Sequence, residues 1–558
     1  MSQNLWRQLS PFPHLWGCML NIISALLLSA FIESKAMIPK TLLEFATEKM
    51  LTILLVKERA KCRRRNRNDK HHTLDKECDI QELSSRKMLS RMMPPRYTWV
   101  RPSKKIKLAN HASDTSKNAE KALLLSISRD RKRQSEGVSF PYLDEMDLFF
   151  NKIRSRLASE DLHFESPRLM PILKKVEKKD DQTIHVTCRP LSVYTQLEDK
   201  IILALTSRYL TSYFDRFLHE NILSYRPARS FQGKVHYVTD FNDGVELIKA
   251  FRNAHNNSTI FAADCDIKKF YDIIPHQVVR DCFWRLLHMS ELDDDGKRQV
   301  MKVVEAYLDS YNFYTNAWLE STRNVSAFDK VRRRLHDYQN NNTYELQWVN
   351  DIWKLPREEY LHLGVPQGGA LSLLVANIVL NDVDKVLVST HDDNMLFIRY
   401  CDDMILLHTD YDECCRLIGL YAQSLKQHGL YYHDFGNVAD GSRSRFWELK
   451  SHRPFLWGDG AGNCNRYIGF LGYEIRRDGR LRLRKSNIKR FEEKFNRLRY
   501  ALHRYRQSHS EEEFQAHQKK VLDNVLDGVA FYSSLDLQQF KQGSQYRHLW
   551  KLRQRFFE

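Results

Sequence analysis

The pattern of apolar and polar positions divides this chain of 558 residues into four parts. The first 60 residues are predicted to be helical, because apolar positions recur at helical spacing in residues 42–56. A polar, basic stretch follows to about residue 137, which predicts a linker or a surface arm. From residue 140 to about 473, short apolar runs alternate with helical stretches, the pattern of an α+β or α/β domain. The last 80 residues are predicted to be helical, with one packed and one basic face.

One apolar stretch, Leu15–Ile32, is at the short edge of the length that a membrane span requires. It contains polar residues, and its flanks lack both a basic region and a convincing cleavage site. We therefore expect no membrane partner and a buried or interface helix here. A homo-oligomer or a partner protein would supply the surface that buries it.

The net charge of +17 and the pI of about 9.3 change this picture by pointing to a polyanionic partner. Nucleic acid is the commonest such partner, although a generally basic soluble protein is the alternative. Tyr97 and Trp99 lie within the basic arm, and aromatic and Arg side chains together suit RNA or DNA. The ten cysteines form no C-x-x-C pair, which argues against a zinc finger and is typical of reduced thiols in the cytoplasm.

Two adjacent carboxylates, Asp402 and Asp403, interrupt an apolar run over 396–407 that predicts a β-hairpin. Buried charges of this kind need compensation, and a divalent cation with oxygen ligands is one source of it. A plain turn with solvated carboxylates is the alternative. Upstream, residues 261–267 predict a strand that would deliver Asp266 beside this pair. Three carboxylates suit two Mg²⁺ ions, or Mn²⁺, about 3.5–4 Å apart for in-line phosphoryl transfer.

A third segment, Gly364–Ser372, lies between these acidic motifs and reads G-V-P-Q-G-G-A-L-S. Its adjacent glycines permit a close approach of backbone to a substrate, although P-Q-G-G alone is typical of a plain turn. A helix is predicted over residues 371–388.

Together these segments resemble a known enzyme family. Asp266–Asp272 (D-I-K-K-F-Y-D), Gly364–Ser372 and Tyr400–Asp403 (Y-C-D-D) resemble palm motifs A, B and C of reverse transcriptases. Cys188–Val193 and Ser224–Ser230 resemble fingers motifs, and Tyr467–Tyr473 resembles the primer-grip strand. The resemblance covers roughly residues 170–480, with the motifs in the family's order.

The resemblance implies an α+β right-hand polymerase with fingers, a palm with an antiparallel sheet, a helical thumb and a helical N-terminal extension. The implied division is an extension and basic arm (1–139), fingers (140–255), palm (256–286 and 361–478), an insertion (287–360) and thumb (479–558).

Residue roles follow from the resemblance by position. Asp266, Asp402 and Asp403 would be catalytic metal ligands, with Ile267 offering its backbone carbonyl. The resemblance also implies the substrate-binding residues. Tyr271 would be a steric gate against ribose, and Arg189 would contact the triphosphate. Gln367, Gly368 and Gly369 would form a nucleotide–template pocket, and Lys450 would be a general acid. The open alternatives are a core aromatic for Tyr271, a surface salt bridge for Arg189 and a competing Lys426 for Lys450.

The subgroup is inferred by elimination. The N-A-x-x-H and V-T-G motifs of retrons are absent, and the 85 residues after Tyr473 are too few for both a maturase domain and an endonuclease. The chain then resembles the bacterial unknown-group and abortive-infection reverse transcriptases, which act in antiphage defence. Ser372-Leu373 and Cys401 depart from the commonest motif forms.

This resemblance implies a reverse transcriptase of the bacterial cytoplasm that adds dNTPs to a 3′-hydroxyl and makes DNA. Synthesis would be RNA-directed, with a structured non-coding RNA as a candidate template, or template-independent. The alternatives are a mobile-element reverse transcriptase, group II intron-like or retron-like, and a non-catalytic RNA-binding scaffold with a polymerase fold.

Overall fold

The computed structural model describes eleven stretches of the chain, namely residues 40–68, 76–101, 112–179, 183–231, 234–238, 241–319, 340–341, 357–390, 392–436, 443–460 and 462–518. The apolar stretch Leu15–Ile32 lies outside them. Among the helices in these stretches, none combines the length and the apolar character needed to cross a bilayer.

The centre of the palm is a sheet with the strand order β11-β10-β5-β8-β7, and β9 pairs with β10. The pairings of β10 with β5, of β5 with β8 and of β8 with β7 are antiparallel, whereas the short β9 and β11 are parallel to β10. The strands are β5 (Phe261–Asp266), β7 (Met395–Tyr400), β8 (Asp403–His408), β9 (Phe435–Gly436), β10 (Ser451–Trp457) and β11 (Cys464–Asn465). The predicted strand at 261–267 and the predicted hairpin at 396–407 are therefore confirmed.

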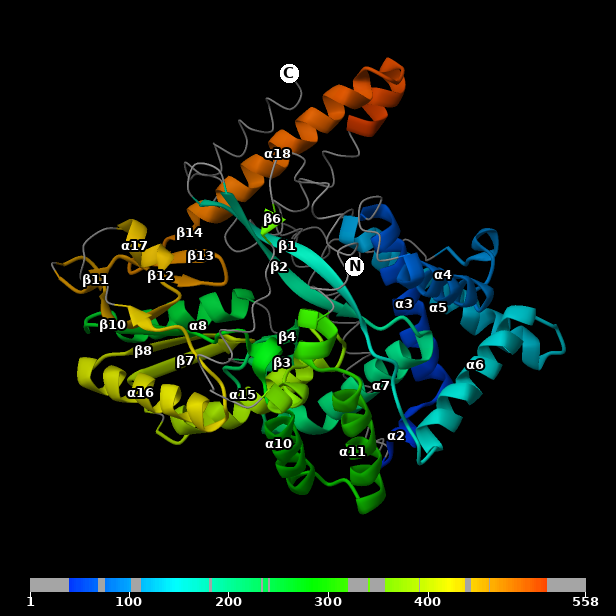
Figure 1. The fold of residues 1–558 in the computed structure, drawn as a ribbon, viewed down its shortest axis with the longest axis horizontal. Helices are drawn as coiled ribbons and strands as arrows, with labels where there is room; N and C mark the ends of the chain where they lie inside the picture. The colour runs from blue at the N-terminus through cyan, green and yellow to red at the C-terminus, as the bar shows by residue number, and fades with distance from the viewer. Residues whose placement is uncertain are drawn as a thin grey trace, which may run out of the picture.

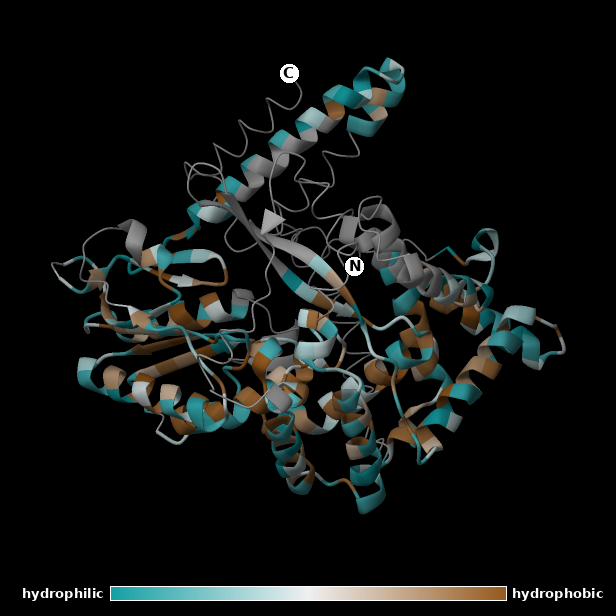
Figure 2. Ribbon diagram, in the orientation of Figure 1, coloured by the Kyte–Doolittle hydropathy of each residue, from teal (hydrophilic) through white to brown (hydrophobic). Residues whose placement is uncertain are grey.

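The long palm strands are rich in apolar residues because both faces of the sheet are covered, as Figures 1 and 2 show. Successive side chains in a strand point to opposite faces. In β8, Met404 and Leu406 pack in the larger core with α15 (Ser372–Val388) and α16 (Tyr411–Gln427). The intervening Ile405 and Leu407 pack in a smaller core with α8 (Phe241–Ala254).

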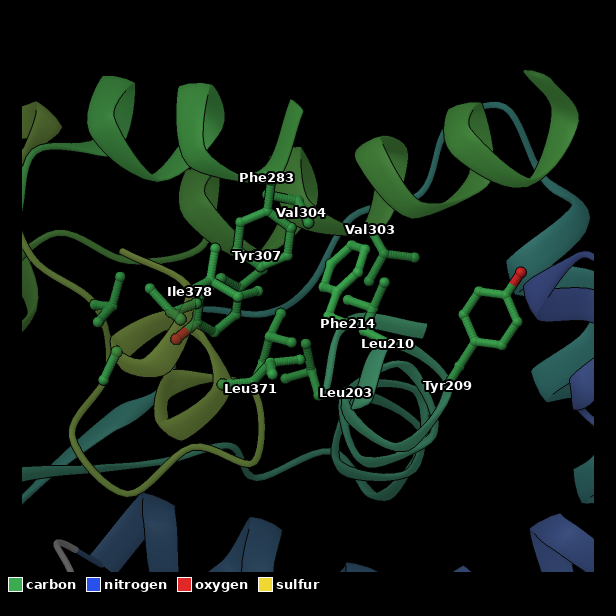
Figure 3. Packing of buried hydrophobic residues seen from close by; sticks show 14 of the residues in the cluster. Leu203, Tyr209, Leu210, Phe214, Phe283, Val303, Val304, Tyr307, Leu371 and Ile378 are labelled. Atoms are coloured by element: carbon green, nitrogen blue, oxygen red, sulfur yellow. The ribbon is translucent and has the colours of Figure 1, made fainter. Parts of the chain in front are cut away.

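The larger core continues into the helices below the sheet. Figure 3 shows Phe214, Phe283 and Tyr307 meeting at its centre. They come from α7 (Leu197–Phe214), α10 (His276–Met289) and α11 (Asp294–Asp309). The boundary expected at residue 287 falls inside α10, so the first part of the expected insertion 287–360 belongs to the core. The domain division as a whole stays a prediction.

The described part of the N-terminal region, residues 40–68, 76–101 and 112–139, is mostly helical, as predicted. Its polar stretch was expected to be a linker or a surface arm. It contains α4 and α5, because a few apolar side chains on one face of these helices, including Leu89, Leu123 and Ile127, pack into the larger core. The helices of this region are α2 (Leu42–Phe45), α3 (Glu48–Asn68), α4 (Lys76–Arg91), α5 (Ala112–Ser135) and α6 (Pro141–Ala158). Helix propensity and a narrow apolar stripe are enough to form packed helices in a stretch that the sequence pattern predicted to be a linker or an arm.

The fingers contain a long antiparallel hairpin that crosses the middle of the molecule in Figure 1. Its strands are β1 (Arg168–Lys179) and β2 (Thr183–Val193), with the short β6 (Asn340–Asn341) parallel to β2. A second hairpin consists of β3 (Pro227–Phe231) and β4 (Lys234–Val238).

The predicted primer-grip strand is instead a hairpin. It consists of β12 (Tyr467–Phe470) and β13 (Tyr473–Arg476), and β14 (Leu481–Leu483) completes its sheet. Leu471 and Gly472 form the turn with φ angles of 49° and 88°, a left-handed conformation that ends an extended strand. The predicted thumb helix follows as α18 (Lys485–Arg506), which projects from the body in Figure 1. The α+β class with an antiparallel palm sheet is confirmed.

The remaining elements are short. They are η1 (Arg96–Thr98), η2 (Asp215–Phe217), α9 (Phe270–Ile273), η3 (Tyr314–Leu319), η4 (Arg357–His362) and α17 (Arg443–Glu448).

Candidate active site

Three carboxylates meet at one end of the palm sheet. Asp266 and Asp403 are directly opposite each other in the antiparallel pairing of β5 with β8. Opposite residues in such a ladder project from the same face with their Cβ atoms about 5 Å apart. Asp402 lies in the turn that joins β7 to β8. The pair is not buried as the sequence pattern suggested, because Asp402 is half-buried and Asp403 is exposed at the tip of a buried hairpin.

The electrostatics of this cluster indicate a shortage of positive charge. The Asp403 carboxylate is accessible to solvent, yet the protein crowds around it. This desolvation, together with the negative charges of Asp402 and Asp266, raises the pKa of Asp403 to about 7. Arg484 acts in the opposite direction without cancelling the effect. Carboxylate oxygens that repel one another are suitable ligands for a hard divalent cation, so these residues fit Mg²⁺.

Two basic side chains approach Asp266 from the loops before β10 and after α16. The Lys450 Nζ is 3.2 Å from Asp266 Oδ2, and the His433 Nε2 is 3.9 Å from the same oxygen. The backbone N–H of His433 also donates to the Asp266 carbonyl at 2.9 Å. Lys426, the competing candidate, instead lies 5.6 Å from the centre of the Tyr432 ring. The structure therefore brings Lys450 to the carboxylates, and it adds His433, which no sequence motif marks.

A buried pair underlies the carboxylates. His452 Nδ1 lies 2.8 Å from both carboxylate oxygens of Asp264, which shares the strand and face of Asp266. The other ring nitrogen of His452 lies 2.8 Å from the Phe446 carbonyl. Burial lowers the pKa of His452, but the hydrogen bond and charge of Asp264 outweigh it and raise the pKa overall. Sequence reasoning missed this pair, although the period-two position of Asp264 relative to Asp266 was a usable signal.

The loop before α15 connects the palm to the fingers. Val365 N–H donates to the Tyr271 carbonyl at 2.8 Å, and Gln367 Nε2 donates to Asp272 Oδ1 at 2.7 Å. On the other side, Ser192 N–H of β2 donates to the Gln367 carbonyl at 2.9 Å. Gly364 has a φ of 89°, and a Cβ there would lie 2.9 Å from the Asp272 carbonyl oxygen. The loop can therefore press closely against the segment that follows β5.

The predicted substrate residues surround this loop. Tyr271 is half-buried, and burial followed by the neighbouring Cys401 and Asp402 raises its pKa. Gly368 is exposed with a φ of 91°, whereas Gly369 is buried against Ser372. Arg189 is exposed on β2, the strand that bonds to Gln367.

Among known proteins, a reverse transcriptase family model matches this chain. Residues 306–434 match the model described as "Reverse transcriptase (RNA-dependent DNA polymerase)". The match includes the loop Gly364–Ser372 and the turn Tyr400–Asp403. This part of the chain matches a reverse transcriptase domain, and the match confirms the predicted enzyme class. No curated protein matches the sequence at a significant level.

Solved structures similar to this chain include telomerases of two yeasts. Apo telomerase from Candida tropicalis truncated from its C-terminal domain is 13% identical, with 57% of this chain and 55% of that chain covered and a TM-score of 0.31. Telomerase from Candida albicans in complex with a TWJ fragment of telomeric RNA is 12% identical, with 83% and 80% covered and a TM-score of 0.29. The chain spans about half the length of the first of these. At such TM-scores the likeness supports no argument about this chain.

A second cluster lies away from the catalytic end, where Cys282, Asp382 and His428 place one potential ligand atom each within 4.8 Å of the others. Its carboxylate already has positive partners. Arg285 lies 2.6 Å from Asp382 Oδ2, His428 Nε2 lies 3.1 Å from it, and Lys385 pairs with the other oxygen. Burial acts to raise the pKa of Asp382, but these partners hold it well below its usual range. We interpret this cluster as structural, since a cation would have to displace Arg285.

Proposed function

We propose that the chain is a DNA polymerase that adds dNTPs to a 3′-hydroxyl, on an RNA template or without a template. The observation that carries the proposal is the convergence of Asp266, Asp402 and Asp403 at one end of the palm sheet. The raised pKa of Asp403 supports it, because desolvation and the negative charges of Asp402 and Asp266 disfavour the charged carboxylate, and a bound cation would relieve both effects.

The proposed cofactor is Mg²⁺, with Mn²⁺ as a substitute. Asp266, Asp402 and Asp403 would hold two ions, and the carbonyl of Ile267, the residue after Asp266, is the proposed additional ligand. When bound, the ions would lower the pKa of the attacking hydroxyl and stabilise the charge of the leaving pyrophosphate. The mutual repulsion of these carboxylates in the metal-free state favours the binding of cations between them.

We assign the surrounding residues to substrate positioning. Tyr271, beside Cys401 and Asp402, would collide with a 2′-hydroxyl and so select dNTPs over NTPs. Gln367 is held from two sides by Asp272 and Ser192, so its loop would keep a fixed position beside the nucleotide and the template. Gly368 and Gly369 would let the backbone approach that nucleotide closely.

Two basic residues would act on the phosphates. Arg189 is exposed on the strand that borders the loop, where a charge-assisted contact with the triphosphate is feasible. Lys450 is paired with Asp266 in the structure. When the proposed metal ions compensate the charge of Asp266, the Lys450 ammonium group would be released from this pair. It would then be available to protonate the leaving pyrophosphate.

Nucleic acid is the proposed partner of the thumb helix α18. Lys489, Arg499 and Arg504 are exposed on it together with Tyr500, whose exposed fraction is 67%. Cations attract phosphates, and an exposed aromatic ring offers a base a stacking surface. The proposed setting is antiphage defence, which rests on the elimination among reverse transcriptase groups described above.

The test uses the purified full-length chain with Mg²⁺, dNTPs and a primed RNA, in parallel with reactions that lack RNA. We expect DNA synthesis in at least one of the two reactions. Asp403→Asn should lower its rate at least about 1000-fold, which corresponds to about 4 kcal/mol of transition-state stabilisation. The matched control is Asp393→Asn, an exposed aspartate before the other end of the hairpin, which should retain wild-type activity.

The outcomes separate the alternatives. Synthesis without RNA, with a product that matches no copurified RNA, identifies the template-independent form. A product that copies a long bound RNA favours the mobile-element alternative. No synthesis in either reaction favours the non-catalytic scaffold, whereas full activity of Asp403→Asn would assign the synthesis to a site other than this carboxylate cluster.

A further inference from the structure

We propose that Ser224 and Arg399 are positioning residues that hold the turn carrying Asp402 and Asp403 in its strained conformation. Both side chains bond to the peptide groups of Cys401, the residue before Asp402. The inference rests on the proposed function, because it concerns the geometry of the same site.

The turn needs outside support because Cys401 has a φ of 55°. This left-handed conformation is unfavourable for a residue with a Cβ atom and persists only where its surroundings enforce it. Here both peptide groups of Cys401 are held by side chains. Its N–H donates to Ser224 Oγ at 3.0 Å, and its carbonyl accepts from Arg399 Nη1 at 3.1 Å.

Ser224 is built for this contact. Its side chain is completely buried, and its hydroxyl donates to Asn377 Oδ1 at 3.0 Å while accepting from Cys401. Asn377 in turn donates from Nδ2 to the Ser224 carbonyl at 2.7 Å. A hydroxyl has one hydrogen to donate, so the bond to Asn377 leaves its oxygen to accept from the turn.

Arg399 is equally specialised. Its Nε lies 2.7 Å from Asp384 Oδ2, and both side chains have an exposed fraction of 0%. Asp384 Oδ1 and Arg399 Nη2 are buried without a hydrogen-bond partner within the described part of the chain. A buried, incompletely bonded ion pair is a poor way to stabilise a core, since apolar residues would often serve as well or better. Its place under the turn indicates that it is retained to position Cys401.

The same contacts attach the turn to the fingers. The Leu223 N–H donates to the Arg399 carbonyl at 2.9 Å, and the Arg399 N–H donates to the Asn221 carbonyl at 3.1 Å. Residues 221–224 therefore run beside β7. Tyr225, which follows them with a φ of 55°, places its hydroxyl within hydrogen-bonding reach of the Cys401 thiol. The catalytic turn is thus held by the segment that begins the fingers motif Ser224–Ser230.

The test compares Ser224→Ala with Ser424→Ala. Ser424 is also buried in the palm, where its hydroxyl donates to the Val383 carbonyl at 3.2 Å. Both variants should lower the thermal unfolding midpoint by a similar amount. We expect Ser224→Ala alone to lower kcat by about 10- to 100-fold, with the KM for dNTP within about twofold, because small displacements of reacting groups cost that much.

A second readout does not depend on catalysis. Binding of Mn²⁺ alone, followed by electron paramagnetic resonance, should be weakened at least about threefold by Ser224→Ala and unchanged by Ser424→Ala. Glycine adopts a positive φ readily. Adding Cys401→Gly to Ser224→Ala should therefore recover kcat by about fivefold, the factor that corresponds to the smaller strain energies.

These measurements separate the two hypotheses. An inactive wild-type chain overturns the proposed polymerase function, and the Mn²⁺ measurement then still decides the positioning role. Equal Mn²⁺ affinities of Ser224→Ala and Ser424→Ala, or equal kcat values, overturn the positioning role. A Ser224→Ala, Cys401→Gly double variant no more active than Ser224→Ala also contradicts it, since strain at Cys401 is then not the cause.

Discussion

Two clusters of potential metal ligands differ in how the charge of their carboxylates is compensated. At the catalytic end, Asp403 faces Asp266 and Asp402, and its pKa rises to about 7. In the second cluster, Asp382 is surrounded by Arg285, Lys385 and His428, and its pKa is depressed. The difference teaches that the balance of charge, and not the gathering of ligand atoms, distinguishes a candidate metal site from a structural ion-pair network.

The largest expected contrast is in catalysis. Asp402→Asn should lower the rate of DNA synthesis at least about 1000-fold, because it removes one of the three proposed carboxylate ligands of the metal ions. Asp382→Asn should leave the rate within about threefold of wild type. Both rates are measured with saturating Mg²⁺ and dNTPs. Comparable losses of rate in Asp402→Asn and Asp382→Asn would contradict this contrast and would favour a metal site at the second cluster.

The second contrast is in stability, because substitutions in the two clusters should change the free energy of unfolding in opposite directions. Asp382→Asn should lower the free energy of unfolding by about 1–2 kcal/mol, because it weakens bonds to three positively charged partners, two of them well exposed. Asp403→Asn should raise that free energy by about 0.5 kcal/mol in metal-free protein, since it relieves repulsion that solvent partly screens.

Urea unfolding in the presence of a chelator measures both values. A destabilised Asp403→Asn would show that the catalytic cluster is not in electrostatic conflict. Added Mg²⁺ should stabilise the wild type and Asp382→Asn but have less effect on Asp403→Asn.

The smallest contrast is in pH dependence. The hydrogen bond that His428 donates to Asp382 raises the pKa of His428 in the folded chain above its ordinary value. The stability from this pair is therefore fully present below about pH 6.5 and is lost as the pH rises through the folded pKa. We expect a loss of about 0.5 kcal/mol between about pH 6 and about pH 8.5.

His428→Gln should remove this part of the pH dependence, whereas His288→Gln, which changes an exposed histidine of α10, should retain it. Unfolding free energies at the two pH values decide the matter. An unchanged slope in His428→Gln would assign the pH dependence to another group.

The sequence sufficed for features that depend on local pattern. The hairpin around Asp402, the strand that carries Asp266 and the helix after the Gly364–Ser372 loop are each marked by apolar periodicity or by a family motif. Their register followed only from the structure. The pattern within one strand does not indicate which residue of the partner strand lies opposite, so it did not predict that Asp266 pairs with Asp403.

Features that depend on distant partners were missed. Arg399 is visible in the sequence as a charge that follows an apolar run, which shows that it needs a partner but not which one. Asp384 lies between Asp382 and Lys385, so its neighbours in the sequence do not mark it as buried. His433 and His452 reach the site through loops and a neighbouring strand, so no spacing along the chain relates them to Asp266 or Asp264. The helices α4 and α5 were interpreted as an arm because only a few of their side chains are apolar.

The palm sheet, with both faces covered, has a consequence for mutational tolerance. Met404 and Leu406 are constrained by α15 and α16, whereas Ile405 and Leu407 are constrained by α8 and by the hairpin of β12 and β13. Alternate positions of one strand therefore accept or reject substitutions independently, because each set adapts to a different neighbour. A change of side-chain size on one face of the catalytic strand can therefore be accommodated by one layer without repacking the other.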